Sequence, residues 1–226
     1  MPDRKVRIAI VDYGLGNLFS VKLACECAGM DAQITASQQE LFAADAVILP
    51  GVGAFADAMR ELKKLDLIAP LKDYSQTGKS LFGICLGMQL LMTESYEFGT
   101  HKGLGIVDGD VVPLENLSSL FNGVPRMLKV PQVGWNQIWR RPDHKNWAGT
   151  PFDSLSDGEY MYFVHSFYVR PQEDALVLSR TRYGQMEFCS SLQYNSTFAC
   201  QFHPERSGRQ GLLVYKNIAK IVAATH

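Results

Sequence analysis

The sequence lacks several features that would each point to a particular class of protein. It contains no hydrophobic run of membrane-spanning length, and only a short apolar run follows the basic residues near its start. Neither a transmembrane helix nor a secretory signal is therefore predicted. It has no block of lysine and arginine, and its formal net charge of -1 argues against a nucleic-acid partner. Repeats, low-complexity tracts and flexible linkers are also missing, so we expect one cytoplasmic domain over residues 1–226.

Cysteine is scarce and odd in number. The five cysteines are Cys25, Cys27, Cys85, Cys189 and Cys200. An odd count in a chain of this length, without an export signal, favours reduced thiols over a disulfide framework. Cys25 and Cys27 lie two positions apart in a segment of helical spacing, where side chains point to different sides, so we expect small buried side chains there. We expect neither a metal nor a cofactor.

Hydrophobic patterning predicts an α/β fold. In the first half, apolar runs at 6–11, 46–49 and 80–84 alternate with segments of helical spacing at 18–28, 55–62 and 88–94. Such alternation is typical of a mostly parallel sheet flanked by helices. From 103 to 201 the chain is rich in β-branched and aromatic residues with frequent turns, which predicts antiparallel strands that extend the sheet or fold beside it. A last helix is expected at about 209–224.

One cysteine stands between two glycines, in the stretch SLFGICLGMQLL. A strand that ends in Gly-x-Cys-x-Gly and turns at once into a helix has the layout of a nucleophile elbow. The glycines allow a cramped turn, the helix amino terminus favours a thiolate at Cys85, and the backbone N–H of Leu86 is placed to stabilise an oxyanion. The alternative is a buried cysteine in a glycine-rich turn.

A cysteine nucleophile needs a base, and the sequence FHPE near the end supplies one. In an extended segment, residues two apart project to the same face, so His203 and Glu205 can lie side by side. Pro204 between them fits the end or edge of a strand. Alone, this pair would indicate only a surface histidine beside a charge; together with the elbow it predicts a catalytic triad.

A second glycine-rich turn, PGVGAF, follows the strand predicted at 46–49. With Ala56 it formally matches a dinucleotide fingerprint, but the next strand ends at Cys85 rather than at the acidic residue which that fingerprint requires. We instead expect a flexible loop whose backbone N–H groups line the same sheet edge as Cys85.

In this order, the motifs PGVGAF, GICLGMQLL, VGWN, FVHSFYV and QFHPE resemble those of the class I glutamine amidotransferases. PGVGAF with GWN resembles, more narrowly, the glutaminase subunits of imidazole glycerol phosphate synthases. The resemblance covers nearly the whole chain and implies the class I glutamine amidotransferase fold. It also implies hydrolysis of glutamine to glutamate and ammonia through a cysteine thioester. The ammonia would pass to a (β/α)8-barrel cyclase partner, in a heterodimer that makes imidazole glycerol phosphate and AICAR in histidine biosynthesis.

The same resemblance implies roles for individual residues. Cys85 would be the nucleophile, His203 the general base and acid, and Glu205 the residue that orients the imidazole. The residues matching the oxyanion loop are Gly51, Val52 and Gly53, and those matching glutamine-binding positions are Gln89, Glu97, His165, Ser166 and Phe167. The sheet edge that carries Cys85, with DYGLGN and GWN nearby, would be the docking face for the cyclase.

Two positions depart from the subfamily pattern, and other functions stay open at this point. Gln132 stands where the subfamily usually has histidine, and Phe167 where tyrosine is common. A paralogous glutaminase could feed another acceptor enzyme, for example in surface-sugar modification. The same scaffold could also support a cysteine hydrolase of another small amide or peptide, or a non-catalytic interaction module. The intact cysteine and His-x-Glu pair argue against the module.

Overall fold

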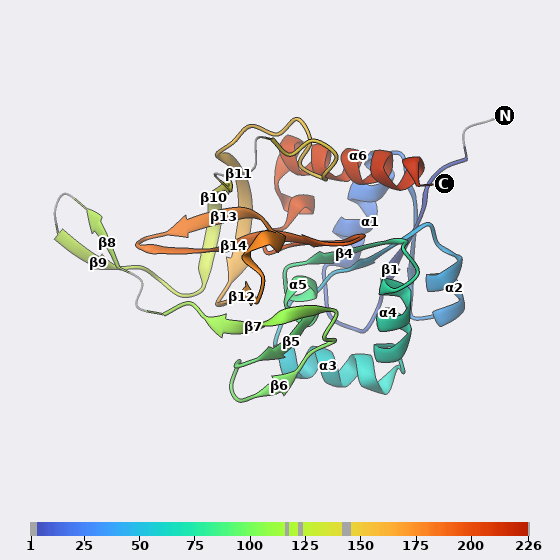
Figure 1. Cartoon of the computed structure of the whole chain (residues 1–226), viewed down its shortest axis with the longest axis horizontal. Coiled ribbons are helices and arrows are strands. Elements are labelled where there is room, and N and C mark those ends of the chain that lie inside the picture. Colours follow the sequence, from blue (N-terminus) through green and yellow to red (C-terminus); the bar gives the residue numbers. More distant parts are fainter. Residues whose placement is uncertain (1–3, 116–117, 122–123, 142–145, 226) are drawn as a thin grey trace.

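The computed structural model describes residues 4–115, 118–121, 124–141 and 146–225, and its centre is a sheet of 13 strands. Five neighbouring strands run parallel, in the order β2-β1-β3-β4-β15 (Figure 1). Their bounds are Asp31–Thr35 for β2, Arg7–Val11 for β1, Ala46–Leu49 for β3, Ser80–Ile84 for β4 and Thr197–Cys200 for β15. The strand β15 comes from the end of the chain and inserts beside β4, so the last parallel strand is supplied by the second half of the sequence.

The second half extends the same sheet with mostly antiparallel pairs, and this decides between the two arrangements expected from the sequence. The further strands are β14 (Met186–Tyr194), β12 (Phe167–Pro171), β7 (Val107–Pro113), β5 (Met92–Ser95), β6 (His101–Lys102), β13 (Val177–Tyr183), β10 (Gln132–Arg140) and β11 (Glu159–His165). A separate two-stranded sheet pairs β8 (Ser118–Phe121) with β9 (Val124–Met127) at one end of the molecule (Figure 1).

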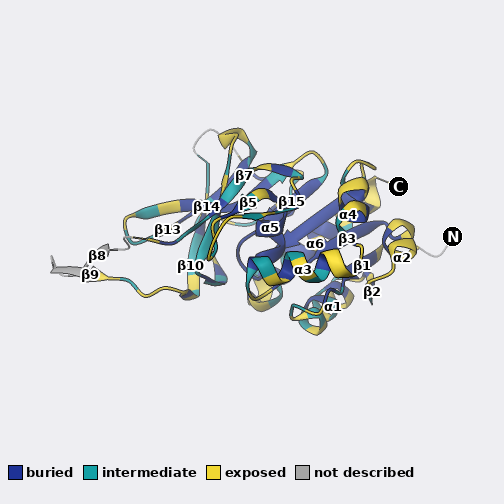
Figure 2. Ribbon diagram, turned by 90° about the horizontal axis from the view of Figure 1, so that it is seen from below, coloured by how far each residue is buried: buried dark blue, intermediate teal, exposed yellow. Residues whose placement is uncertain are grey.

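Helices cover both faces of the parallel strands and create two hydrophobic cores. One face carries α1 (Leu18–Cys27) and α6 (Gly208–Ala224), and the other carries α2 (Gln38–Ala43), α3 (Phe55–Lys64), α4 (Ile68–Ser75) and α5 (Leu86–Leu90) (Figure 1). Figure 2 shows the parallel strands almost entirely buried between these layers. The strands β3 and β4 are buried at every position, as expected for a parallel sheet covered on both sides.

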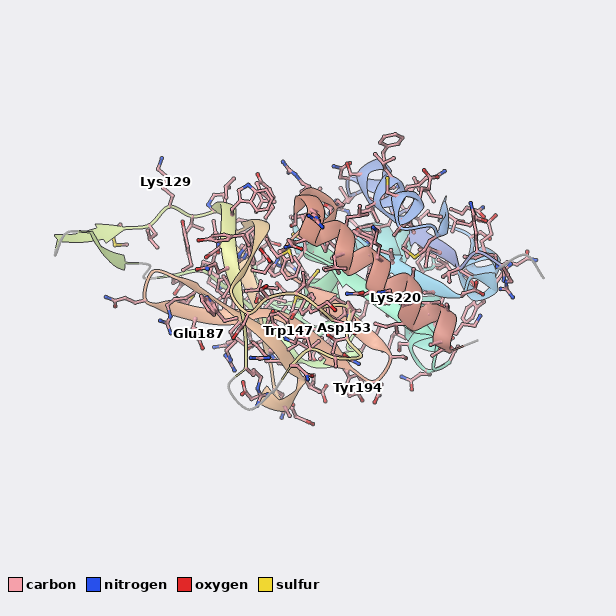
Figure 3. The ribbon with its side chains drawn as sticks, turned by 90° about the horizontal axis from the view of Figure 1, so that it is seen from above. Lys129, Trp147, Asp153, Glu187, Tyr194 and Lys220 are labelled. Atoms are coloured by element: carbon pink, nitrogen blue, oxygen red, sulfur yellow. The ribbon has the colours of Figure 1, made fainter. Side chains whose placement is uncertain are left out.

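The segment between β10 and β11 closes the α6 side of the molecule. Figure 3 shows Trp147 and Asp153 in this segment, with α6 running beside it. The indole N–H of Trp147 donates to the carbonyl oxygen of Leu178, and the Asn217 amide of α6 donates to those of Pro151 and Asp153. In the described part of the chain, no helix is long and apolar enough to cross a membrane.

The predicted strands and most helices are confirmed, but the helix predicted at 88–94 is wrong. The helix α5 ends at Leu90, and Met92–Ser95 forms the strand β5. The carbonyl groups of Leu90 and Met92 accept hydrogen bonds from the backbone N–H groups of Leu104 and Gly105. These carbonyl groups therefore bond a later segment of the chain instead of the next turn of a helix. Helical spacing alone could not reveal that competition.

Candidate active site

Cys85 follows the last residue of β4 and adopts a backbone conformation that is rare for any residue other than glycine. Its φ is 54° and its ψ is -111°. The elbow also depends on close backbone packing, because a Cβ added at Gly87 would lie 1.8 Å from the carbonyl oxygen of Leu49. Strained backbone of this kind costs about 1–3 kcal/mol and is concentrated at functional sites. The glycines therefore do what the sequence predicted, which is to permit a turn too tight for side chains.

His203 and Glu205 lie at the end of β15, the strand next to β4. Nδ1 of His203 lies 2.7 Å from Oε1 of Glu205, and both side chains are almost completely buried. The pair meets as expected, but the geometry differs from the prediction: Pro204–Arg206 is a 3-10 turn rather than extended chain. His203 is also fixed through its backbone, since its N–H donates to the carbonyl of Tyr162 and its carbonyl accepts from the Ser207 hydroxyl.

The charge state of His203 depends on its two neighbours. Burial alone would lower the pKa of His203. Charge at the nearby Cys85 sulfur opposes this, as do the hydrogen bond and charge of Glu205, and together they raise the pKa of His203 to about 10. The charged imidazole is therefore held between the Cys85 sulfur and the Glu205 carboxylate, an arrangement that suits nucleophilic catalysis.

Two further polar groups lie around the Cys85 sulfur. The carbonyl oxygen of Val164 lies 3.8 Å from Sγ and can accept from the neutral thiol. Nε2 of Gln201 lies 3.7 Å from Sγ. Sequence reasoning did not single out Gln201, although it precedes FHPE directly and the parallel register of β4 with β15 places it opposite Cys85.

The glycine-rich turn PGVGAF lies beside Cys85, as predicted, but the carbonyl group of Gly51 faces the elbow. The N–H of Leu86 donates to the carbonyl oxygen of Gly51 at 3.3 Å, so the expected oxyanion donor is engaged. One residue earlier, the buried Tyr13 hydroxyl donates to the carbonyl of Pro50 at 2.7 Å and holds the start of the turn. Gly51 is packed so closely that a Cβ would lie 2.1 Å from that hydroxyl.

A cavity of about 390 Å³ opens onto Cys85. The predicted site residues that line it are Val52, Gly53, Cys85, Leu86, Gln89, Glu97, His165, Ser166 and Phe167. Arg206, which sequence reasoning missed, also lines the cavity, and its guanidinium lies 4.3 Å from the centre of the Tyr162 ring. Gly51, His203 and Glu205 are not among the lining residues.

Two of the predicted substrate contacts already have protein partners. The Gln89 amide nitrogen donates to the carbonyl oxygen of Phe167 at 3.0 Å and to Oε1 of Gln201 at 3.1 Å. Only its own oxygen is left to bind a ligand. A carboxylate oxygen of Glu97 accepts from the backbone N–H of Phe55, the first residue of α3. Glu97 thus anchors the helix that follows the glycine-rich turn, and it also lines the cavity.

The strand end His165-Ser166-Phe167 forms one wall of the cavity. Nδ1 of His165 donates to the carbonyl of Phe167 at 2.8 Å, and burial lowers the pKa of His165 to about 4 despite that bond. The ring is therefore neutral, and its Nε2 contacts the amide of Gln132. Oε1 of Gln132 is placed 3.1 Å from this Nε2, and because a neutral Nε2 can only accept, a hydrogen bond between them requires the amide to present its NH2 group instead. The departure at Gln132 is thus accommodated behind His165.

Two cysteines outside the site, Cys25 and Cys27, differ in their burial. Cys25 is buried as expected, whereas Cys27 is exposed and the expectation of burial there was wrong. The reason is that α1 turns Cys27 away from the core, since positions two apart lie on different sides of a helix. Among the described residues, no group of histidine, cysteine and acidic side chains could hold a metal. The strained cysteine with a charged histidine beside it can support nucleophilic catalysis.

Comparisons with known proteins agree with this geometry. The family model for class I glutamine amidotransferases matches residues 10–219. The chain is 39% identical to imidazole glycerol phosphate synthase subunit HisH of Aquifex aeolicus over 95% of its own length and 97% of that protein. It is 44% identical to the subunit of the same name from Moorella thermoacetica, covering 95% of each chain.

Solved structures show the same fold at low identity. PurLQS from Thermotoga maritima matches with a TM-score of 0.71 and 20% identity, over 96% of this chain and 99% of that one. A putative GMP synthase subunit from Thermoplasma acidophilum matches with a TM-score of 0.69 and 17% identity, over 98% and 96%. The match of the family model over almost the whole chain, with close relatives of the same class, means that this chain belongs to the class I glutamine amidotransferases.

Proposed function

We propose that residues 1–226 form one glutaminase domain, the ammonia-producing subunit of an imidazole glycerol phosphate synthase. The observation that carries the proposal is the strained Cys85 elbow facing a cavity, with the buried His203–Glu205 pair beside it. The similarity of about 40% to subunits named for that synthase supports the choice of pathway. The cyclase reaction belongs to the partner, so this chain contributes the hydrolytic half.

The first half-reaction is attack of the Cys85 thiolate on the side-chain amide carbon of glutamine. The carbon–sulfur bond forms as the amide oxygen takes up negative charge. His203, held as an imidazolium beside Glu205, gives its proton to the leaving nitrogen, and the carbon–nitrogen bond breaks to release ammonia. A thioester stays on Cys85. In the second half-reaction the now neutral His203 takes a proton from water, which attacks the thioester and releases glutamate.

The oxyanion needs donors that this arrangement of the turn does not offer. The carbonyl of Gly51 and the N–H of Val52 belong to one planar peptide unit, so a single rotation of that unit moves both. Turning it frees the N–H of Leu86 from the Gly51 carbonyl and brings the N–H of Val52 toward the site. Removing one such donor costs about 10²–10³ in rate, so this rotation separates a slow state from an active one.

A partner explains both the rotation and the fate of ammonia. In neutral water, ammonia becomes mostly ammonium, which cannot act as a nucleophile, so it is best delivered through a dry passage. The rim around the site exposes Val52, Val133 and Trp135, with exposed fractions of 40%, 59% and 55%. Large apolar and aromatic side chains of this kind are typical of a protein interface. We propose that the (β/α)8-barrel cyclase docks on this rim and turns the Gly51–Val52 peptide.

Glutamine hydrolysis measured with and without the cyclase of the same organism tests the proposal. We expect glutamate release to rise by at least about 10²-fold when the cyclase and its bound substrate are present, because the oxyanion donors are then assembled. A (β/α)8-barrel enzyme from an unrelated pathway is the matched control and should give no increase. If the chain is equally active alone, the coupling to a partner fails. If only an acceptor enzyme of another pathway activates it, the chain is a paralogous glutaminase.

A further inference from the structure

We propose that Gln201 is a catalytic residue whose side-chain amide donates a hydrogen bond to the Cys85 sulfur, in an orientation imposed by the carbonyl group of Phe167. The proposal deepens the proposed function, since it rests on Cys85 as the nucleophile. It assigns a role to a residue outside the predicted triad, oxyanion loop and substrate-binding set.

The topology brings Gln201 to the sulfur. In the parallel pairing of β4 with β15, Ile84 lies opposite Cys200, so the next residues along each strand are Cys85 and Gln201. The backbone N–H of Cys85 donates to the carbonyl of Cys200 at 2.8 Å, which extends this register to the elbow. The Gln201 side chain has no exposed surface, and its Nε2 lies 3.7 Å from Sγ. Burial of this polar amide is tolerated because its oxygen and its nitrogen both have hydrogen-bond partners.

The direction of the Gln201 amide follows from a chain of obligatory donors and acceptors. A carbonyl oxygen can only accept, so the Gln89 side chain must turn its NH2 group toward Phe167, at 3.0 Å. The same NH2 group lies 3.1 Å from the Gln201 amide, which must therefore present its oxygen to Gln89. Once that oxygen faces Gln89, the NH2 group of Gln201 is the part that faces the sulfur.

A donor in this position favours the reactive form of the nucleophile. A neutral thiol can give its own proton to the Val164 carbonyl at 3.8 Å and gains little from a second donor. A thiolate accepts from Gln201, and hydrogen bonds to charged groups are about twice as strong as those between neutral groups. The amide is uncharged, so it stabilises the thiolate at every pH and does not compete for the proton that His203 carries.

Other titratable groups also act on Cys85, and the test must separate them from Gln201. His203 and Tyr13 lie close enough for their charge states to be coupled to Cys85, and Cys200 is coupled to it through β15. His165, Glu97 and Arg206 line the same cavity. All of these groups are unchanged in a Gln201 variant, so a shift there reports on the amide.

The experiment measures the pH dependence of Cys85 alkylation by iodoacetamide, which needs no glutamine and no partner. Mass spectrometry of the Cys85 peptide isolates this thiol, and the exposed Cys27 is an internal reference whose pH profile should not change. Since only the thiolate reacts, the midpoint of the profile reports how far the site stabilises it. The wild-type Cys85 profile should have its midpoint well below that of Cys27. Equal midpoints would remove the support for Cys85 as an activated nucleophile and thus overturn the proposed function itself.

Two substitutions then test Gln201 against a structural role. Gln201→Met removes the donor and keeps the length, so the Cys85 midpoint should rise by about one pH unit. Gln201→Glu keeps an oxygen for Gln89 to bond but places an anion beside the sulfur, so its midpoint should rise further. In glutamine hydrolysis, both variants should lower kcat more than they change KM. Gln193→Met, on the outer part of β14, is the matched control and should leave both profiles unchanged.

The outcomes are distinguishable. Folded variants, judged by their thermal unfolding, that keep the wild-type Cys85 midpoint would overturn the inference and leave the proposed function intact. Equal shifts in Gln201→Met and Gln201→Glu would point to loss of packing rather than of the donor, and would also overturn it. If neither variant folds, Gln89→Met decides, because it removes the group that fixes the Gln201 amide: a raised midpoint supports the inference and an unchanged one contradicts it.

Discussion

The ends of two neighbouring strands, β4 and β15, hold their reactive side chains by different means. At the end of β4, Cys85 is fixed by backbone sterics, with φ at 54° and Gly87 packed against the carbonyl of Leu49. At the end of β15, His203 is fixed by hydrogen bonds to Glu205, Tyr162 and Ser207. The first arrangement allows almost no change in side-chain size, whereas the second should weaken by steps as single bonds are removed.

The largest expected effect comes from removing the Cys85 sulfur, which joins the two strand ends by its influence on His203. Cys85→Ala should lower glutamine hydrolysis by about 10⁴-fold or more, because the nucleophile is gone while the fold keeps its backbone. It should also lower the pKa of His203 from about 10, because charge at the Cys85 sulfur is the foremost influence that raises it. Glutamate release and NMR titration of the imidazole check the two results. A Cys85→Ala protein that hydrolyses glutamine normally would contradict the assignment of the nucleophile.

The same coupling predicts how stability depends on pH. The pKa of His203 is raised in the folded state from an ordinary value of 6.5 to about 10. The charged imidazole therefore contributes stability that is fully present below pH 6.5 and is lost as the pH rises through about 10. In Cys85→Ala this loss should still begin near pH 6.5 but should be smaller and end at lower pH, because only the folded-state pKa of His203 falls. Urea unfolding from pH 6 to 10 compares the two proteins, and parallel curves would show that the two strand ends are not coupled.

Next in size is a substitution at the sterically fixed end. Gly87→Ala should lower the free energy of unfolding by about 3 kcal/mol or more, because its Cβ would lie 1.8 Å from the carbonyl oxygen of Leu49 and the backbone must shift. Activity should fall with it, since the elbow moves. The control is Gly78→Ala, where φ is +80° but a Cβ meets nothing within 4 Å, and about 1 kcal/mol is expected from the backbone conformation alone. Equal losses in the two variants would mean that close packing does not fix the elbow.

The contrast between the two ends also explains what could be predicted from the sequence. The elbow is encoded locally: an apolar strand, two glycines and a cysteine within a few residues predict the turn, and the structure has it at the expected positions. The parallel strands were equally visible, since buried strands such as Ala46–Leu49 are short continuous apolar runs.

Features that depend on distant partners could not be predicted. The strand Met92–Ser95 has helical spacing in sequence but pairs with residues near Val107. The 3-10 turn that carries Glu205 and the engagement of Leu86 by Gly51 depend on contacts between segments. Nothing in the sequence distinguishes Gln201 from an ordinary polar residue, because its position opposite Cys85 depends on the register of β15 beside β4. These are the same contacts that control the site.

The smallest expected effect is at the hydrogen-bonded end. The buried hydroxyl of Ser207 donates to the carbonyl of His203 at 2.7 Å and accepts from the N–H of Tyr162 at 3.0 Å. Ser207→Ala should therefore lower the free energy of unfolding by about 1–2 kcal/mol, because it leaves a buried N–H and a carbonyl without this partner. Glutamine hydrolysis should fall only a few-fold, since Glu205 still orients the imidazole. Urea unfolding and kcat should be compared with Ser75→Ala, where an exposed hydroxyl bonds the carbonyl of Lys72 and a loss below about 0.5 kcal/mol is expected. If Ser207→Ala instead abolished activity while staying folded, the base would be as intolerant of change as the elbow, and the difference between the two strand ends would disappear.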